Sequence, residues 1–245
     1  MPFRFKNLSK LPWLGHAVST KEFGNLSYFV GDKKANVDAN RKKFFSSLGI
    51  QEKDVVDAVQ VHGNHVVLIT QEEQGHNILD TDALITDEKN IPLIIKVADC
   101  VPILLADPVK KVVGVVHAGW KGTTQEITKL AVNHMEDHFG TSPSDLIVGI
   151  GPSIGPCCYE VDAPVIDAFS GFTYRSKIFS VLPRTVENRK HLDLWLANKF
   201  QLIEAGVREK NIEVAGICTY DNSDKFFSER HDKKAGRFGA IIWIK

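Results

Sequence analysis

Residues 91–123 read IPLIIKVADCVPILLADPVKKVVGVVHAGWKGT, and this stretch decides the fold class. Three apolar runs follow one another in it, at 91–99, 101–107 and 112–118, with short polar breaks between them. Because these runs do not alternate polar with apolar residues, they are typical of strands covered on both faces. The stretch therefore predicts neighbouring buried strands, and the last of them reaches its end at His117.

Helical and strand patterns mix along the rest of the chain. Apolar residues recur at helical spacing over 38–49, 123–140 and 192–206, and each segment ends on a glycine. Further strands are predicted at 145–151, 212–220 and 239–245. Since no linker or repeat divides these elements, we expect a single α+β domain over 1–245, with mixed β-sheets flanked by helices.

Capping side chains support the predicted helix starts. Asp38 and Asp193 each stand where a side-chain oxygen accepts from the first free amides of a helix. Thr123 and Glu126 match the capping-box pattern, so a helix is expected to begin directly after the turn that follows His117.

The composition excludes some classes of partner. Thirty basic residues cancel thirty acidic ones, so no overall field attracts nucleic acid or an anionic membrane. No apolar run approaches the length that crosses a bilayer. The first residues, MPFRFKNLSKLPWLGH, lack an apolar signal core, and four cysteines in a chain of this length need not form disulfides. We therefore expect a cytoplasmic protein with reduced cysteines.

The segment DAVQVHGNHVVLIT, residues 57–70, predicts a β-hairpin. Two β-rich runs surround Gly63–Asn64, a pair that favours the positive φ angles of a two-residue turn. In such a hairpin His62 and His65 would face one another across the strands.

Three polar side chains stand at or near the ends of apolar strands: His62, Cys100 and His117. Two imidazoles and a thiolate suit tetrahedral zinc, and three protein ligands would leave one position open for water or substrate. Other interpretations stay open at this point. Each histidine could be a hydrogen-bonded structural residue, Cys100 a small buried hydrophobe, and His65 the ligand in place of His62.

Other candidate groups have simpler explanations beside the functional ones. Cys157 and Cys158 lie in a Gly/Pro-rich loop, where one thiol could be reactive, although an inert packed pair is the better expectation. His134 and His138 share one helix face at a spacing that can bind metal. That face is also the apolar stripe, which favours packing.

Two stretches predict anion binding. Lys121, Gly122 and Thr123 stand at the expected helix start, where free amides and the helix dipole favour phosphate or carboxylate. The alternative is a solvated lysine in a glycine turn. Further on, Phe226–Phe227 beside Arg230 could stack on a planar ring and hold an anion, or could be core residues next to a surface arginine.

These segments together resemble the YfiH-like laccase-domain proteins, which are generally described as purine nucleoside phosphorylases. The matching pieces, in chain order, are NLS (25–27), NR (40–41), QVHG (60–63), TDALIT (81–86), ADCVPILLAD (98–107), VVHAGWKGT (115–123), IGPSIGPCCYEV (150–161), LDLW (192–195) and FFSERHDKKAGRF (226–238). The resemblance implies a fold shared with a bacterial toxin deamidase, and a catalytic zinc held by His62, Cys100 and His117.

The same resemblance implies a function. It points to phosphorolysis of adenosine, inosine, guanosine and methylthioadenosine to the free base and ribose 1-phosphate, with adenosine deamination as a second activity. Arg41, Lys121 and Arg230 are the candidate phosphate or substrate contacts. Family members usually read FFSYRRD where this chain has FFSERHD. The resemblance therefore implies no substrate contact for Glu229 or His231, the two residues that differ. Purine nucleosides and phosphate are the expected partners, and the expected state is a monomer or weak homo-oligomer.

Three alternative functions are weighed against this one. A multicopper phenol oxidase needs many histidines in close His-x-His pairs, and this chain has nine histidines and no such pair, so zinc is favoured over copper. A cysteine hydrolase would use Cys100 as nucleophile and His117 as base, in line with the family's reported link to peptidoglycan-precursor editing. The last is a zinc-stabilised binding module without catalysis.

Overall fold

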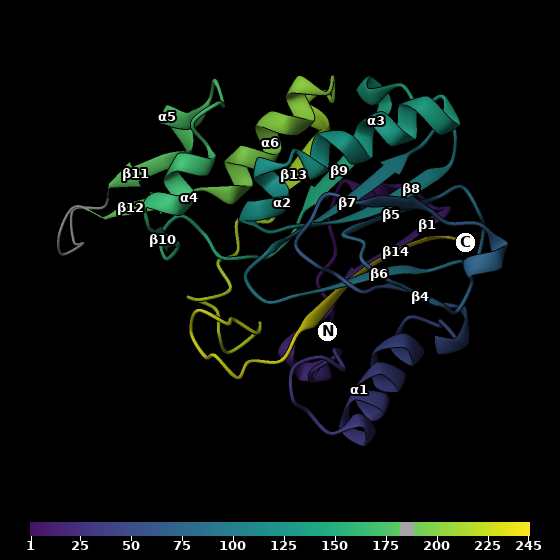
Figure 1. Ribbon diagram of the computed structural model, residues 1–245. Coiled ribbons are helices and arrows are strands. Elements are labelled where there is room, and N and C mark those ends of the chain that lie inside the picture. Colours follow the sequence, from purple (N-terminus) through teal and green to yellow (C-terminus); the bar gives the residue numbers. More distant parts are fainter. Residues whose placement is uncertain (182–188) are drawn as a thin grey trace.

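Two stacked β-sheets lie between two helical layers in this protein (Figure 1). The structure is a computed structural model and describes residues 1–181 and 189–245. Helices α3 (Ile127–Phe139) and α6 (Leu194–Glu204) cover one side of the stack, and α1 (Lys34–Ser47) covers the opposite side. This α+β architecture with mixed sheets confirms the predicted fold class.

The larger sheet carries two of the strands predicted from residues 91–123. Its strand order is β13-β9-β7-β8-β5-β3, with antiparallel pairs in the centre and parallel pairs at both edges. The strands are β3 (Val66–Leu68), β5 (Ala83–Thr86), β7 (Val101–Asp107), β8 (Val112–Ala118), β9 (Ile147–Ile150) and β13 (Ile212–Val214).

The second sheet contains the remaining strand of that stretch and both ends of the chain. Its order is β1-β14-β6-β2-β4, antiparallel from β1 to β6 and parallel from β6 to β4. The strands are β1 (Leu14–Val18), β2 (Val56–Ala58), β4 (Asn77–Ile78), β6 (Leu93–Val97) and β14 (Phe238–Ile244).

A small third sheet extends from one end of this stack together with short helices (Figure 1). It consists of β10 (Glu160–Val161), β12 (Lys190–Leu192) and β11 (Phe179–Val181). The short α-helices are α2 (Trp120–Thr124), α4 (Ala163–Ala168) and α5 (Arg175–Ile178), and 3₁₀ turns lie at Leu8–Lys10, Lys21–Phe23, Glu52–Asp54, Gln71–Glu73, Pro143–Asp145 and Glu209–Asn211. No helix among residues 1–181 and 189–245 has the length and apolarity to cross a membrane.

The apolar runs are buried on both faces, as predicted. In β7, Ile103 and Leu105 pack in the core beneath α3 and α6, whereas Leu104 packs between the two sheets. In β6, Ile95 faces the space between the sheets and Ile94 packs against the α1 layer. These strands need no polar face, because each sheet is covered on one side by helices and on the other by a sheet.

The predicted hairpin at residues 57–70 is wrong. Strands β2 and β3 belong to different sheets, and the segment between them is a loop in which His62 has a φ of 61°. The Asp82 carboxylate accepts hydrogen bonds from the amides of Val61, His62 and Gly63. These contacts satisfy the backbone groups that a partner strand would have taken.

Helix starts differ from the predicted ones in two places. Helix α1 begins at Lys34, before Asp38. The helix expected after His117 is split into α2 and α3, because Glu126 takes a left-handed conformation with a φ of 57°. The Thr123 hydroxyl accepts from Asn198 in α6, so it does not cap α3. The cap at Asp193 is confirmed, since its carboxylate accepts from the Leu196 amide.

Acid should weaken the fold through His16 in β1. Its Nε2 accepts from the Phe5 amide at 3.0 Å, and burial together with nearby Arg4 lowers the pKa of His16 to about 4. An unfolded histidine binds a proton near pH 6.5, so this contribution is complete above that pH and is lost as the pH falls toward 4. We expect the free energy of unfolding to fall by up to about 3 kcal/mol across this window.

The measurement is urea unfolding of wild type and His16→Gln at pH 7 and pH 4.5. The glutamine keeps a hydrogen-bond acceptor but does not titrate, so the two proteins should differ less at pH 4.5 than at pH 7. Equal pH dependence in both proteins would contradict this role for His16.

Candidate active site

Cys100 lies in the tight turn that joins the two sheets. The turn occupies Ala98–Cys100 between β6 and β7, and Asp99 in it has a φ of 77°. The Asp99 carboxylate accepts from the Thr219 hydroxyl at 2.6 Å and from the Arg230 amide at 2.7 Å. The thiol is therefore presented from a turn that is anchored on both sides.

His117 is brought beside this turn by the pairing of β7 with β8. Pro102 lies opposite His117 in the ladder, and Val101 lies opposite Ala118. The next residue, Gly119, sits so close to the site that a Cβ there would come within 3.1 Å of the Cys100 Sγ and 3.2 Å of the His62 ring. Glycine at this position leaves the three side chains room to converge.

Asp82 holds both histidines in place. Its carboxylate contacts Nδ1 of His117 at 2.6 Å and accepts the amide of His62 at 3.0 Å. Its own carbonyl accepts from the His117 amide at 2.7 Å. Since Nδ1 of His117 is engaged, Nε2 is the nitrogen free to bind a ligand, as in carboxylate–histidine–metal arrangements.

The structure brings His62, Cys100 and His117 together, the trio proposed from the strand ends. Their donor atoms lie within 4.8 Å of one another. A tetrahedral zinc ion would draw such ligands to roughly 3.5 Å apart. The two imidazole rings meet edge to face with centroids 4.8 Å apart. His65 is excluded from this group, and its Nδ1 instead lies 3.1 Å from the Asp80 carbonyl.

Within the trio, Cys100 and His117 shift one another's pKa values. Burial alone would raise the pKa of Cys100, but the neighbouring His117, with hydrogen bonds from His117 and His62, lowers it to about 6. Burial would lower the pKa of His117, yet Cys100 and Asp82 raise it to about 9. A thiolate ligand is thus available at neutral pH, which suits a metal that binds sulfur and nitrogen.

A cleft of about 630 Å³ opens directly onto these ligands. That volume lies in the range of pockets that hold small organic ligands. Cationic side chains from several segments line it, together with aromatic ones. The cations are Lys96, Arg230, Lys233 and Arg237, and the aromatic residues are Phe29, Trp120 and Tyr159.

Of the three predicted phosphate contacts, only Arg230 lines the cleft. Its guanidinium lies 5.3 Å from the centre of the Tyr159 ring and donates to the Glu160 carbonyl. Arg41 is buried elsewhere, against Asp57 and Glu52. Lys121 is exposed and extends over the ring of Trp120. The Thr123 amide is also used inside α2, where it donates to Gly119, so the expected anion site at this helix start lacks that donor.

The remaining sequence candidates fall outside the trio. Phe226 belongs to the core between the sheets, which bears out its structural interpretation. Glu229 pairs with Arg237, and His231 packs edge to face with Tyr220. His134 and His138 lie side by side along α3 with tilted rings, whose centroids are 5.4 Å apart.

Cys157 and Cys158 are not reactive thiolates in this structure. Burial and a hydrogen bond to the Asp221 carboxylate raise the pKa of Cys157 to about 12 and raise that of Cys158 as well. A thiol with a raised pKa is a poor nucleophile at neutral pH.

Several residues of the site were missed by sequence reasoning, among them Asp82, Lys96, Trp120 and Tyr159. Asp82 stands before a buried strand in TDALIT, so a polar residue at a strand start was the available signal. Lys96 interrupts the apolar run of β6 and was visible in the same way. Trp120 and Tyr159 carry no such signal, because an aromatic residue in a turn is equally consistent with packing.

If the trio holds a zinc ion, Asp82→Asn is expected to weaken its binding by about 10–100-fold, the usual effect of removing a partner that orients a metal-bound histidine. The amide preserves the size of the side chain but no longer fixes the His117 tautomer by charge. Competition with a chromophoric zinc chelator measures the affinity. Unchanged affinity with an intact fold would show that Asp82 only supports the loop.

The chain is similar to one known protein family and to named proteins from several bacteria. The profile of a family described as multi-copper polyphenol oxidoreductase laccase matches residues 13–245. A Bacillus subtilis protein named purine nucleoside phosphorylase YlmD is 37% identical, covering 93% of this chain and 85% of that protein. A Bacteroides thetaiotaomicron protein named purine nucleoside phosphorylase is 33% identical, covering 98% and 95%.

Solved structures share the fold over nearly the whole chain. The crystal structure of the hypothetical protein YfiH of Bacillus licheniformis superposes with a TM-score of 0.90 at 33% identity, covering 95% of this chain and 93% of that one. YlmD from Geobacillus stearothermophilus gives a TM-score of 0.87, also at 33% identity, covering 96% and 93%.

Proposed function

The chain belongs to the family described as multi-copper polyphenol oxidoreductase laccase, and from that premise we propose that it is a zinc-dependent purine nucleoside phosphorylase. Phosphate would attack C1′ of the nucleoside, the glycosidic bond would break, and the products would be the free purine and ribose 1-phosphate. The substrates we propose are adenosine, inosine, guanosine and methylthioadenosine. One observation carries the proposal: a single cleft joins the His62, Cys100 and His117 set to cationic and aromatic walls.

The chain's own residues divide the work of binding and orientation. Arg230 offers a planar cationic fork for phosphate, held in place by its contact with Tyr159. Trp120 and Phe29 offer aromatic faces for a purine ring. Positioning both reactants in one cleft removes much of the entropic barrier to the displacement.

The ligand set fits zinc, and His62, Cys100 and His117 would hold it. A bound zinc ion supplies a Lewis acid for phosphate or ribose oxygens and lowers the pKa of a coordinated water. Asp82 would keep His117 oriented throughout, and Gly119 would keep the approach to the ligands open.

Copper oxidation of phenols, which the family's description names, fits these residues less well. A multicopper cluster needs more imidazoles in one place than the two that meet at Cys100. Nine histidines are spread over the chain, all within the residues that the structure describes.

A second candidate function rests on the arrangement around Cys100. Its thiol is hydrogen-bonded to His117, whose other nitrogen contacts the Asp82 carboxylate, so the three form a Cys–His–Asp series. That series is the geometry of a cysteine hydrolase, with Cys100 as nucleophile and His117 as base. The cationic cleft would then hold a different, acidic substrate.

One experiment tests the proposed phosphorylase activity. Metal-analysed protein is incubated with inosine or adenosine, with and without phosphate, and the products are resolved by chromatography. Phosphorolysis gives free base and ribose 1-phosphate only when phosphate is present. Base released without phosphate would contradict the proposal in favour of hydrolysis, and inosine formed from adenosine would reveal deamination.

A further inference from the structure

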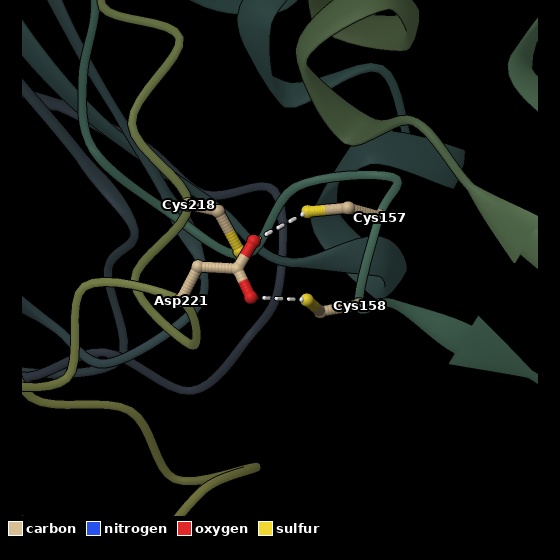
Figure 2. Close-up of side chains that lie close together, drawn as sticks. All are labelled: Cys157, Cys158, Cys218 and Asp221. Atoms are coloured by element: carbon tan, nitrogen blue, oxygen red, sulfur yellow. Dashed lines mark hydrogen bonds between the residues drawn. The ribbon is translucent and has the colours of Figure 1, made fainter.

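Besides the trio, the structure brings together a second group of side chains of the kinds that can hold a metal ion (Figure 2). Cys157 and Cys158 come from the loop between β9 and β10, and Cys218 and Asp221 come from the segment after β13. We propose that these four residues form a separate, structural zinc site that fastens the two segments together.

The donor atoms already converge. The three sulfur atoms and a carboxylate oxygen lie within 4.8 Å of one another. Both Asp221 oxygens are engaged, one 3.2 Å from the Cys157 Sγ and the other 3.1 Å from the Cys158 Sγ (Figure 2). A tetrahedral zinc ion with Zn–S bonds of about 2.3 Å holds sulfur atoms roughly 3.8 Å apart. The four groups therefore need only a small contraction to bind one ion.

The backbone around the group is arranged for thiolate sulfur. The Gly155 amide donates to the Cys218 Sγ at 3.3 Å, a contact that stabilises sulfur when it is ionised. Gly155 also has no room for a side chain, since a Cβ would lie 2.8 Å from the Trp195 ring and 3.2 Å from the Cys157 Sγ. Because Gly155 has no side chain, the loop can pass close to the sulfur atoms of both Cys157 and Cys218.

The identity and number of the donors decide the kind of site. Cys218 and Asp221 have the C-x₂-D spacing of a zinc knuckle with aspartate in place of the second cysteine. Three sulfur donors exclude magnesium and calcium, which take oxygen ligands. Four protein ligands close the coordination sphere, and a closed sphere is typical of a structural zinc, unlike the three-ligand set in the cleft. On binding, Zn²⁺ would displace one proton from each thiol.

The two segments that this ion would join both reach the cleft. Tyr159 follows Cys158 and lines the cleft, with Arg230 over its ring. Thr219 follows Cys218, and its hydroxyl donates to Asp99 beside Cys100. The second site therefore lies one residue from groups that position both the phosphate-binding arginine and the first zinc ligand.

Zinc content of the full chain tests this inference. Wild type, purified without chelator and without an affinity tag, should carry two zinc ions per chain. Cys218→Ser and Asp221→Asn should each lose one of them, and Cys100→Ala should lose the other. Asp224→Asn, which changes an exposed carboxylate three residues after Asp221, is the matched control and should retain two.

Cobalt substitution of the wild type gives a second readout that needs no variant. Three thiolates at this site and one at the trio should produce thiolate-to-cobalt absorption in two titration steps, with the larger amplitude about three times the smaller. Zinc content that is the same in Cys218→Ser, Asp221→Asn and wild type would overturn the inference, whether wild type carries one ion or two. A Cys–Cys disulfide found by mass spectrometry in freshly purified protein would also overturn it. If wild type carries both zinc ions but shows no phosphorolysis, the proposed function is overturned and the second zinc site is not.

Discussion

Replacing Cys100 with alanine is expected to lower kcat/KM for inosine phosphorolysis by about a thousandfold and to release the zinc ion that we propose for the cleft. The thiolate is the only anionic ligand in the trio of Cys100 and two histidines. Without it, two neutral imidazoles hold the metal weakly, and the several kcal/mol of charge stabilisation that a metal supplies are lost.

His62→Ala and His117→Ala should reduce activity to a similar extent if zinc is required. A cysteine hydrolase would behave differently, because His62 is neither its nucleophile nor its base. Activity that survives in His62→Ala but not in Cys100→Ala would therefore favour the hydrolase.

His65→Ala is the matched control for these variants. It lies three residues from His62 in the same loop, but its ring contacts the Asp80 carbonyl and takes no part in the trio. Its activity and zinc content should match wild type. If Cys100→Ala keeps both phosphorolysis and zinc, the site assignment is contradicted.

The strand ends made part of this site predictable. Cys100 and His117 each stand at an end of an apolar run, and a strand end delivers its side chain to a rigid edge of a sheet. The pairing of β7 with β8 then brings the two together with no long-range information. Cys100 and His117 could therefore be predicted as neighbours from the local sequence alone.

His62 was placed by residues that local patterns do not connect. The predicted hairpin failed because the Asp82 carboxylate takes the loop amides, and Asp82 follows His62 by 20 residues. Thr123 failed as a cap for the same kind of reason, since its hydroxyl is bonded to Asn198 in another helix. Secondary-structure propensity depends on the residues of one segment, whereas these side chains form hydrogen bonds with residues far away in the sequence.

Arg41 is part of a buried ion-pair cluster and does not lie in the cleft. The family resemblance made it a candidate phosphate or substrate contact, but in the structure its guanidinium donates to Asp57 at 2.8 Å and lies over the Phe45 ring. Lys96 contacts the other oxygen of Asp57. One buried carboxylate thus joins α1 to strands β2 and β6, next to the cleft that Lys96 lines.

Asp57→Ala should lower the free energy of unfolding by about 3–5 kcal/mol, a large part of the 5–15 kcal/mol typical of a folded domain. The side chains of Asp57, Arg41 and Lys96 are all at least 93% buried, so the variant leaves two cations close together and away from water. Burial already lowers the pKa of Lys96, with Asp57 opposing that shift. Urea unfolding followed by circular dichroism measures the change.

Glu52→Ala is the matched control, because Glu52 binds the same Arg41 at 2.6 Å but its side chain is 40% exposed. Water replaces an exposed partner at little cost, so this variant should lose only about 0–1 kcal/mol. Adding Lys96→Met to Asp57→Ala should recover part of the loss, since it removes one of the uncompensated charges. Equal losses in Asp57→Ala and Glu52→Ala would show that burial does not set the strength of this cluster.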